Sequence, residues 1–278
     1  MKYLKKLYYK NISPNFFTPA NKQTKFKIFK NIKHKIKPKD VLIITAYDDG
    51  YSKIGKLSEK SIKLYAKKFS FRSKILRIPS DFERHKAWYK IKLLIDLIKN
   101  KKNKIIVWID SDAVFTRYVD LRNELDDYHE FYLVSHKIKI KNFSKYKNTE
   151  LAISRINTGV MIFKNTKFNY DLLNKVWNNQ KYLNSGWWDN SAFLDELGYK
   201  GEIEKNLKKH TGNIKLTKKM KLLPNEWNSV PSSANLDFLL ETHNPIILHT
   251  AGYNFNHKKE IIKKYFIQSD KIKIKFKK

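Results

Sequence analysis

Apolar runs separated by segments with helical periodicity predict a domain in which strands and helices alternate. The helical segments carry apolar residues three and four positions apart, and they lie at 58–69, 82–99 and 171–183. The strand segments are short apolar or β-branched runs, and they lie at 41–47, 73–78, 104–109, 130–136 and 156–165. This order predicts an α/β fold that begins at Asp40.

The segments outside this alternation are rich in lysine. Residues 1–39 contain three prolines and show no sustained period, which predicts a basic N-terminal extension. Residues 258–278 end in KIKIKFKK and are predicted to form a basic C-terminal tail. We expect one domain, residues 40–257, between them, because no internal repeat divides it.

The charge of the chain is strongly positive, with 58 Lys and Arg against 26 Asp and Glu and a formal net charge of +32 at pH 7. Such a charge favours encounter with nucleic acids, acidic membrane surfaces or phosphorylated substrates. Nearly all the cations are lysine, however, and a genome biased towards A and T would produce this excess without any partner. The chain has no Cys, which excludes disulfides and thiolate-bound zinc or iron–sulfur sites.

The sequence predicts a protein that stays in the cytoplasm. It contains no apolar stretch of about 18 residues, and residues 1–10 lack the apolar centre of a signal peptide. Tyr3, Leu4, Leu7 and Tyr8 would share one face of a basic helix, which suits peripheral association with an acidic membrane surface. A solvated, frayed terminus is the alternative interpretation.

Two carboxylates, Asp110 and Asp112 in VWIDSDAVF, directly follow the strand at 104–109. Ligands of open α/β sheets bind at the carboxyl ends of parallel strands, and the alternation of an extended chain points both acids to one side. Two carboxylates suit Mn²⁺ or Mg²⁺ shared with a substrate phosphate. Because 15 Asp in 278 residues give about one such pair by chance, two solvated acids are the alternative.

Polar residues also mark two other strand ends. His249 follows the short apolar run IIL and is either structural or a nitrogen ligand that Mn²⁺ would accept. Asn157 and Gly159 begin the strand at 156–165. They form either a bulge or a place where an amide and an open backbone approach a polar ligand such as a sugar.

A tryptophan-rich turn, SGWWDNSAF, precedes another expected helix. Asp189 and Asn190 follow Trp187 and Trp188 in this turn. They are either helix caps beside core tryptophans or polar groups next to a platform on which a sugar ring stacks.

Taken in order, these segments resemble the GT-A fold nucleotide-sugar glycosyltransferases, and most of all glycosyltransferase family 34, the galactosyl- and xylosyltransferase group. The resemblance rests on VLIITAY, AWYKIKLLIDLI before VWIDSDAVF, INTGVMIFKN, GWWDNSAF and ILHTAGY. It implies a single α/β domain with a mixed, mostly parallel central sheet flanked by helices. It also implies retaining transfer of galactose, glucose or xylose from a UDP-sugar, with Mn²⁺ or Mg²⁺ bridging the diphosphate, to a glycan, glycolipid or glycoprotein acceptor.

The resemblance also implies a role for each matching position. Asp110, Asp112 and His249 match the metal ligands, and Asp189 and Asn190 match an acid and an amide that face the donor sugar and the reacting carbon. Asn190 stands where Gln is common. The expected donor-binding positions are Ala46, Tyr47, Lys86, Ser111, Asn157, Gly159, Gly252 and Lys258, with Lys90 as the alternative to Lys86.

Two other functions compete with this one. A nucleic-acid-binding protein would interleave aromatic and basic residues on one surface, but the aromatics here lie in apolar runs and arginine is scarce. Nucleic acid is therefore not an expected partner. A metal-dependent phosphotransferase or nuclease would use the same Asp pair, but it requires further acids around a second metal, and none is obvious.

Overall fold

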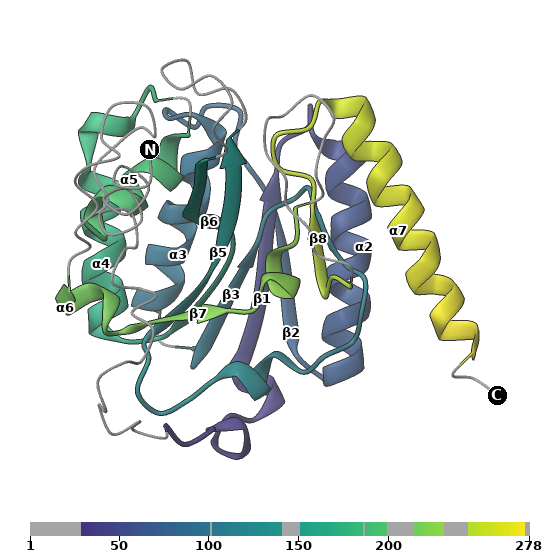
Figure 1. Cartoon of the computed structure of the whole chain (residues 1–278), viewed down its shortest axis with the longest axis horizontal. Helices are drawn as coiled ribbons and strands as arrows, with labels where there is room; N and C mark the ends of the chain where they lie inside the picture. Colours follow the sequence, from purple (N-terminus) through teal and green to yellow (C-terminus); the bar gives the residue numbers. More distant parts are fainter. Residues whose placement is uncertain are drawn as a thin grey trace, which may run out of the picture.

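The computed structural model describes residues 29–100, 102–140, 151–185, 187–198, 214–230 and 244–275. Its centre is a six-stranded sheet with the order β2-β1-β3-β6-β5-β7 (Figure 1). These strands are β1 (Val41–Tyr47), β2 (Arg72–Arg77), β3 (Ile105–Ile109), β5 (Phe131–Ile140), β6 (Leu151–Lys164) and β7 (Met220–Leu223). Only β6 among them runs against the others, so the sheet is mixed and mostly parallel, as predicted.

Helices cover both faces of this sheet. In Figure 1, α3, α4 and α5 lie on one side, and α2 and α7 lie on the other. Their bounds are α2 (Ser52–Phe69), α3 (Tyr89–Lys99), α4 (Lys167–Asn178), α5 (Trp188–Glu196), α6 (Ile214–Thr217) and α7 (Phe255–Lys275). Short 3-10 helices connect the elements, namely η2 (Lys33–Lys35), η3 (Pro38–Asp40), η4 (Lys86–Trp88), η5 (Leu121–Glu124), η6 (Gln180–Tyr182) and η7 (Asn225–Asn228).

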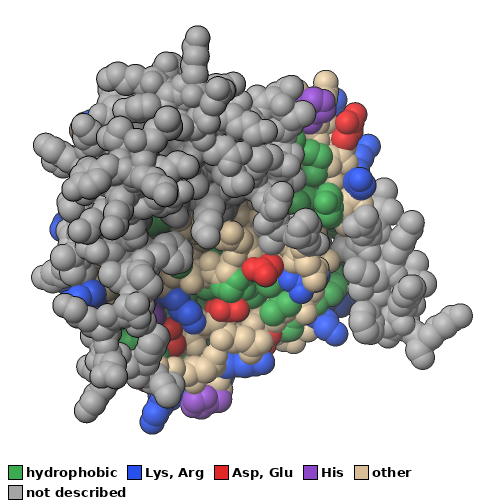
Figure 2. Space-filling view, viewed as in Figure 1, with side chains coloured by type: hydrophobic (Ala, Val, Ile, Leu, Met, Phe, Trp, Pro, Cys, Tyr) green, Lys and Arg blue, Asp and Glu red, His purple; other side chains and the backbone are tan. Residues whose placement is uncertain are grey.

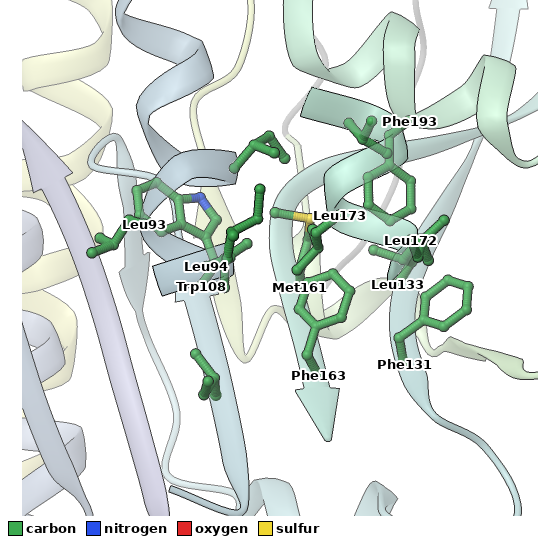
Figure 3. Close-up of a cluster of buried hydrophobic side chains, with 14 of the residues drawn as sticks. Leu93, Leu94, Trp108, Phe131, Leu133, Met161, Phe163, Leu172, Leu173 and Phe193 are labelled. Carbon is green, nitrogen blue, oxygen red and sulfur yellow. The ribbon is translucent and has the colours of Figure 1, made fainter. Parts of the chain in front are cut away.

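The continuous apolar runs form strands because the sheet is buried on both faces. Along β1, Leu42 and Ile44 pack in the cluster under α3, whereas Val41 and Ile43 pack in the cluster under α2. Figure 3 shows part of the first cluster, in which side chains of β3, β5 and β6 meet those of α3, α4 and α5. Its labelled members are Leu93, Leu94, Trp108, Phe131, Leu133, Met161, Phe163, Leu172, Leu173 and Phe193.

A second, two-stranded sheet stands beside the ends of the central strands. It pairs β4 (Ala113–Phe115) with β8 (Ile247–His249) in antiparallel register, and Ala113 lies opposite His249. The chain enters β4 directly after the turn that follows β3. This pairing therefore joins two segments more than 130 residues apart at the carboxyl edge of the main sheet.

The strand at 156–165 carries the bulge that Gly159 suggested. Leu133 of β5 pairs with Met161 of β6, but the next residue, Val134, pairs with Asn157. The intervening residues of β6 are therefore displaced from β5, while Val160 still pairs with Ile109 of β3. This irregularity places Asn157, Thr158 and Gly159 beside the end of β3.

Several predicted elements differ in extent. The helix expected over 82–99 begins only with η4 and α3, where the His85 ring accepts a hydrogen bond from the Ala87 backbone N–H as the N-cap of η4. The helix expected at 171–183 is α4, which starts at Lys167, where the Thr166 hydroxyl accepts a hydrogen bond from the Asn169 backbone N–H.

The basic C-terminal segment was expected to be a tail, but its described part is the helix α7. The predicted boundary between residues 257 and 258 falls inside this helix, and Ile262 of α7 packs with Ile54 of α2. Of the predicted N-terminal extension, residues 29–39 are described, and Ile32 and Ile36 are buried against the domain. The part with the proposed membrane-binding face lies outside the described residues.

Candidate functional site

The Asp pair lies at the carboxyl edge of the sheet, in a turn between β3 and β4. The Ala113 backbone N–H donates to the Asp110 carbonyl at 3.0 Å, and the Asp110 N–H donates to the Gly159 carbonyl at 2.8 Å. The Asp110 carboxylate accepts from Trp108 Nε1 at 2.6 Å and from Lys90 Nζ at 2.9 Å, both on Oδ1. These contacts leave Oδ2 directed towards His249, 3.7 Å from its Nε2.

Asp112 is more deeply buried, with 7% of its surface exposed. Its carbonyl accepts from both the backbone N–H and the hydroxyl of Thr250, at 3.0 and 2.9 Å. Its carboxylate lies between the imidazole of His249 and the ammonium of Lys258. Oδ1 is 3.2 Å from His249 Nε2, and Oδ2 is 2.5 Å from Lys258 Nζ. Burial alone would raise the pKa of Asp112, but His249 and Lys258 outweigh it and hold the pKa below its usual range.

His249 therefore meets the Asp pair, which the sequence could suggest but not show. The pairing of β8 with β4 sets it opposite Ala113, and one ligand atom from each of Asp110, Asp112 and His249 lies within 4.8 Å of the others. Two hard carboxylate oxygens and one imidazole nitrogen form a donor set that Mn²⁺ accepts readily and Mg²⁺ accepts less well. The residues present thus fit a divalent cation.

A second buried network adjoins Asp110 through Lys90. The Lys90 ammonium, on α3, is buried and lies 2.9 Å from Asp110 Oδ1 and 3.2 Å from Asp189 Oδ2. Burial would lower the pKa of Lys90, but the two carboxylates outweigh burial and raise it. For Asp189 the balance is reversed, because burial raises its pKa and Lys90 offsets only part of that effect.

Thr158, in the bulge of β6, fixes the acid and the amide that begin α5. Its backbone N–H donates to Asn190 Oδ1 at 2.9 Å. Its hydroxyl lies 2.9 Å from Asp189 Oδ2 and 3.1 Å from Asn190 Oδ1 and can donate to either oxygen. A backbone N–H only donates, so the oxygen of the Asn190 amide must face Thr158. Among the described residues, no hydrogen bond uses the remaining Nδ2 group of Asn190, which is left as a donor.

The first residue of α5 has an unusual backbone. Trp188 has a φ of 37°, in the left-handed region that residues other than glycine rarely adopt. Its ring stacks on His85, with centroids 3.6 Å apart and the planes at 4°. Trp187 is one of two large hydrophobic side chains that are exposed in the described part of the chain, at 40%. Trp187 is therefore exposed beside this turn, whereas Trp188 is half-buried and packs against the cluster under α3.

Asn157 and Gly159 meet His249 from the other side. The side-chain oxygen of Asn157, Oδ1, accepts hydrogen bonds from the Gly159 backbone N–H at 2.7 Å and from Asn228 Nδ2 at 2.9 Å. A Cβ atom at Gly159 would overlap the His249 ring, so this position has to be glycine for the ring to lie where it does. The segment is a bulge, as one interpretation predicted, and it lies against His249; its contact with a sugar stays a prediction.

Lys258 and Gly252 follow β8. Gly252 adopts a φ of 79° in the turn that leads from Thr250 into α7. Lys258, in the first turn of α7, donates to the Tyr51 hydroxyl at 2.7 Å as well as to Asp112. Burial, and next the charge of Asp112, raise the pKa of Tyr51 to about 12, so its hydroxyl keeps its proton.

Four expected donor-binding positions lie apart from these contacts. Ala46 is buried in the sheet core, and Tyr47 faces α2, where its hydroxyl donates to Glu59 Oε2 at 2.6 Å. Lys86 donates to the carbonyls of Pro79 and Ser80, at 2.9 and 3.5 Å, so it is Lys90 and not Lys86 that reaches the Asp pair. Ser111, in the turn between the two acids, is partly exposed.

No sequence pattern marks Thr158 or Asn228 as a site residue. Thr158 lies between two residues that were singled out, and only the bulge shows that it contacts α5. Asn228 lies in PNEWN, a segment with no periodic pattern, and it reaches His249 only because η7 packs on β8.

A family model of nucleotide-diphospho-sugar transferases matches residues 41–260 of the chain. Among solved structures, a glycosyltransferase involved in glycosylation of the major capsid protein of PBCV-1 is similar in fold, with a TM-score of 0.52 and 10% identity over 81% of this chain and 98% of that one. The galactosyltransferase LgtC, solved with donor and acceptor sugar analogues, has a TM-score of 0.47 and 11% identity over 83% and 95%.

The glycosyltransferase GlyE of Streptococcus pneumoniae TIGR4 has a TM-score of 0.42 and 13% identity, over 83% of this chain and 63% of that one. No curated protein matches the sequence significantly. In the described part of the chain, no helix has the length and apolar character needed to cross a membrane.

Proposed function

Since the chain belongs to the nucleotide-diphospho-sugar transferase family and has a GT-A fold, we propose that it transfers a sugar from a UDP-sugar to a glycan, glycolipid or glycoprotein acceptor and retains the anomeric configuration. The observation that carries this proposal is the convergence of Asp110, Asp112 and His249 at the carboxyl edge of the sheet, next to the buried Asp189. Galactose, glucose or xylose is the proposed sugar, on the strength of the family 34 resemblance.

Asp110, Asp112 and His249 are the proposed ligands of Mn²⁺ or Mg²⁺. A divalent ion at this position would supply positive charge for the diphosphate and stabilise the negative charge that develops on the leaving UDP. The protein prepares the site without it: Trp108 and Lys90 orient Asp110, and Thr250 holds the backbone of Asp112.

Lys258 is the proposed contact of the chain with the diphosphate. Its ammonium is held at the site by Asp112 and by the Tyr51 hydroxyl, so it is already close to the place that a phosphate would occupy. A lysine acts on phosphate as a point charge and can exchange a carboxylate partner for a phosphate partner without a change of backbone. Gly252 sets the turn that brings α7 and Lys258 to this position.

Asp189 and Asn190 are the proposed residues at the reacting carbon. Asp189 is buried and paired with Lys90, which favours electrostatic stabilisation of an oxocarbenium-like centre over attack on it. The Asn190 oxygen already accepts a hydrogen bond from the Thr158 backbone N–H, so we propose that its Nδ2 group donates to a sugar hydroxyl or to the acceptor.

In the proposed reaction, the bond between the anomeric carbon and the UDP oxygen breaks while the acceptor oxygen forms its bond to the same face of that carbon. The proton of the acceptor hydroxyl passes to the departing phosphate oxygen, so no base from the chain is consumed. This account is an internal-return displacement. It requires no covalent intermediate on Asp189.

The two rival functions receive no support from the described residues. Within them, Asp110, Asp112 and His249 form the one group of three or more His, Asp or Glu side chains that could hold a metal, and a second metal site would require another. On the face shown in Figure 2, the described Lys and Arg side chains are scattered and do not gather into one band. A nucleic-acid-binding surface would require such a band.

We also propose a cytoplasmic location and peripheral contact with an acidic membrane surface. The net charge of +32 supports the membrane contact. A flotation assay with vesicles that contain or lack anionic lipid would test the contact, and equal binding to both would reject it.

The activity is tested with purified protein, a panel of UDP-sugars, and either Mn²⁺ or a chelator. We expect UDP release with at least one sugar, thermal stabilisation by UDP only when Mn²⁺ is present, and loss of both in Asp110→Asn. Asp171→Asn is the matched control, because Asp171 forms only an exposed pair with Lys167. Release that continues in the chelator or in Asp110→Asn would reject the metal assignment, and no release with any UDP-sugar would reject the donor.

A further inference from the structure

His249 divides its two ring nitrogens between two sets of partners. Its Nε2 faces the carboxylates, 3.2 Å from Asp112 and 3.7 Å from Asp110. Its Nδ1 lies 2.9 Å from Oδ1 of Asn228, which is completely buried at the end of η7. Which nitrogen of the neutral ring has a lone pair for a metal ion therefore depends on which one carries the hydrogen.

The backbone settles the orientation of the amides behind the ring. The Gly159 N–H can only donate, so the atom of Asn157 that faces it, 2.7 Å away, must be the carbonyl oxygen. That same oxygen faces the amide of Asn228 at 2.9 Å and can only accept from it. Asn228 therefore presents its NH₂ group to Asn157 and its carbonyl oxygen to His249.

A carbonyl oxygen only accepts, so His249 has to carry a hydrogen on Nδ1. In the neutral ring, Nε2 then has the free lone pair, and it faces Asp110 and Asp112. We infer that Asn228 is a positioning residue of this site, which holds His249 in the tautomer and orientation that a divalent cation requires. This inference rests on the proposed function for the cation, but the tautomer itself is tested separately below.

The surroundings leave the ring little freedom to compensate. His249 is 2% exposed, and its ring lies directly over Gly159, where a Cβ atom would overlap it. Asn157, Asn228 and His249 form this chain of hydrogen bonds, and they come from β6, η7 and β8, which are far apart in the sequence. A hydrogen-bond partner behind a metal-binding histidine typically contributes 10- to 100-fold in metal affinity. Asn228 would contribute in this way without touching the metal or the substrate.

The direct test is the tautomer of His249 in the metal-free protein, read from the nitrogen chemical shifts of the ring in a long-range ¹H–¹⁵N NMR spectrum. The signals of His249 are assigned by their loss in His249→Gln. We expect Nδ1 to carry a hydrogen in the wild-type protein, and to lose it to Nε2 in Asn228→Leu, where no acceptor faces Nδ1. A wild-type ring with its hydrogen on Nε2 would overturn the inference, whether or not the chain is a glycosyltransferase.

The second readout is the affinity for Mn²⁺, measured by calorimetry without any nucleotide. Asn228→Leu keeps the size of the side chain and removes both hydrogen bonds, and we expect a 10- to 100-fold loss of affinity. Asn169→Leu is the matched control, because Asn169 is also completely buried and donates twice, to the carbonyls of Glu130 and Lys164, away from the site.

The two variants separate positioning from general stability. We expect both to lower the melting temperature, but only Asn228→Leu to weaken Mn²⁺ binding. Equal affinities in Asn228→Leu and wild type, or an equal loss in Asn169→Leu, would show that Asn228 is only structural. If the wild-type protein itself fails to bind Mn²⁺, the proposed metal site is wrong, and the NMR measurement still decides the tautomer.

Discussion

The buried ammonium of Lys90 should be the most costly charge in the site to remove. It is 5% exposed and lies 2.9 Å from Asp110 and 3.2 Å from Asp189. At an effective dielectric constant of about 20, each of these attractions amounts to about 5 to 6 kcal/mol, and desolvation of the buried groups offsets much of the total. Asp189 is the partner left in the worse position, because its side chain is 4% exposed whereas that of Asp110 is 24% exposed.

We therefore predict that Lys90→Met lowers the free energy of unfolding by about 3 to 5 kcal/mol at pH 8, the usual cost of leaving a buried charge without its partner. Urea denaturation in the presence of a chelator measures this without metal. Lys92→Met is the control, since Lys92 lies on the same helix in an exposed pair with Asp96 and should contribute less than about 1 kcal/mol.

The double variant identifies the cause of the loss. Asp189→Asn in the Lys90→Met background removes the stranded charge, so we expect it to restore part of the stability, although the same substitution in the wild-type background removes a partner of Lys90. The two changes should therefore be strongly non-additive. Additive effects, with no recovery in the double variant, would refute the reasoning that Asp189 is the stranded charge.

The pH dependence gives an independent check with a definite sign. Burial raises the pKa of Asp189 in the folded protein, and loss of Lys90 would raise it further. A carboxyl whose folded pKa lies above its unfolded pKa binds its proton more tightly in the folded state, so its contribution to stability is lost as pH rises. The deficit of Lys90→Met relative to wild type should therefore be smaller at pH 5 than at pH 8.

Two further substitutions test packing and charge in the described residues. Gly55→Ala should destabilise the protein by about 1 to 3 kcal/mol because its Cβ would overlap the Tyr47 ring, although helix propensity alone favours alanine. Gly50→Ala is the control, since its Cβ would meet only Asp48 at 3.5 Å. Equal melting temperatures of the two variants would contradict the overlap. Lys258→Gln should strengthen binding of Mn²⁺ alone, since the competing cation on Asp112 is gone, but weaken binding of UDP with Mn²⁺; calorimetry measures both, and changes of the same sign would contradict the assignment.

The centre of the sheet could be predicted from the sequence because strands such as β1 and β3 are buried on both faces and therefore appear as continuous apolar runs. Helix α7 was missed because its apolar residues, such as Ile262, are few among the lysines, and only its packing on α2 makes it part of the domain. Local pattern says little about such a helix when tertiary contacts decide its stability.

For the site, the sequence could predict residues that stand at strand ends, and it could not predict partners set by packing. Asp110 and His249 were predicted because each follows an apolar strand, and the β4–β8 pairing brings them together. Tyr47 also ends a strand, but Gly55 leaves space for its ring against α2, so it faces away from the Asp pair. Asn228 had no pattern of its own, and its contact with His249 depends on the packing of η7.

The strong positive charge of the chain says less about this site than the local balance does. Three buried or half-buried acids, Asp110, Asp112 and Asp189, face two lysines, so the site is close to neutral before any ligand enters, although the chain carries +32. Lys90 is buried and already paired with two carboxylates, so its charge is neutralised within the protein. Lys258 stands on α7 at the edge of the same group, with one carboxylate and a tyrosine hydroxyl as partners. If the proposed donor binds here, a diphosphate and a divalent cation entering together would bring opposite charges to Lys258 and Asp112, so that neither residue would be left buried without a partner.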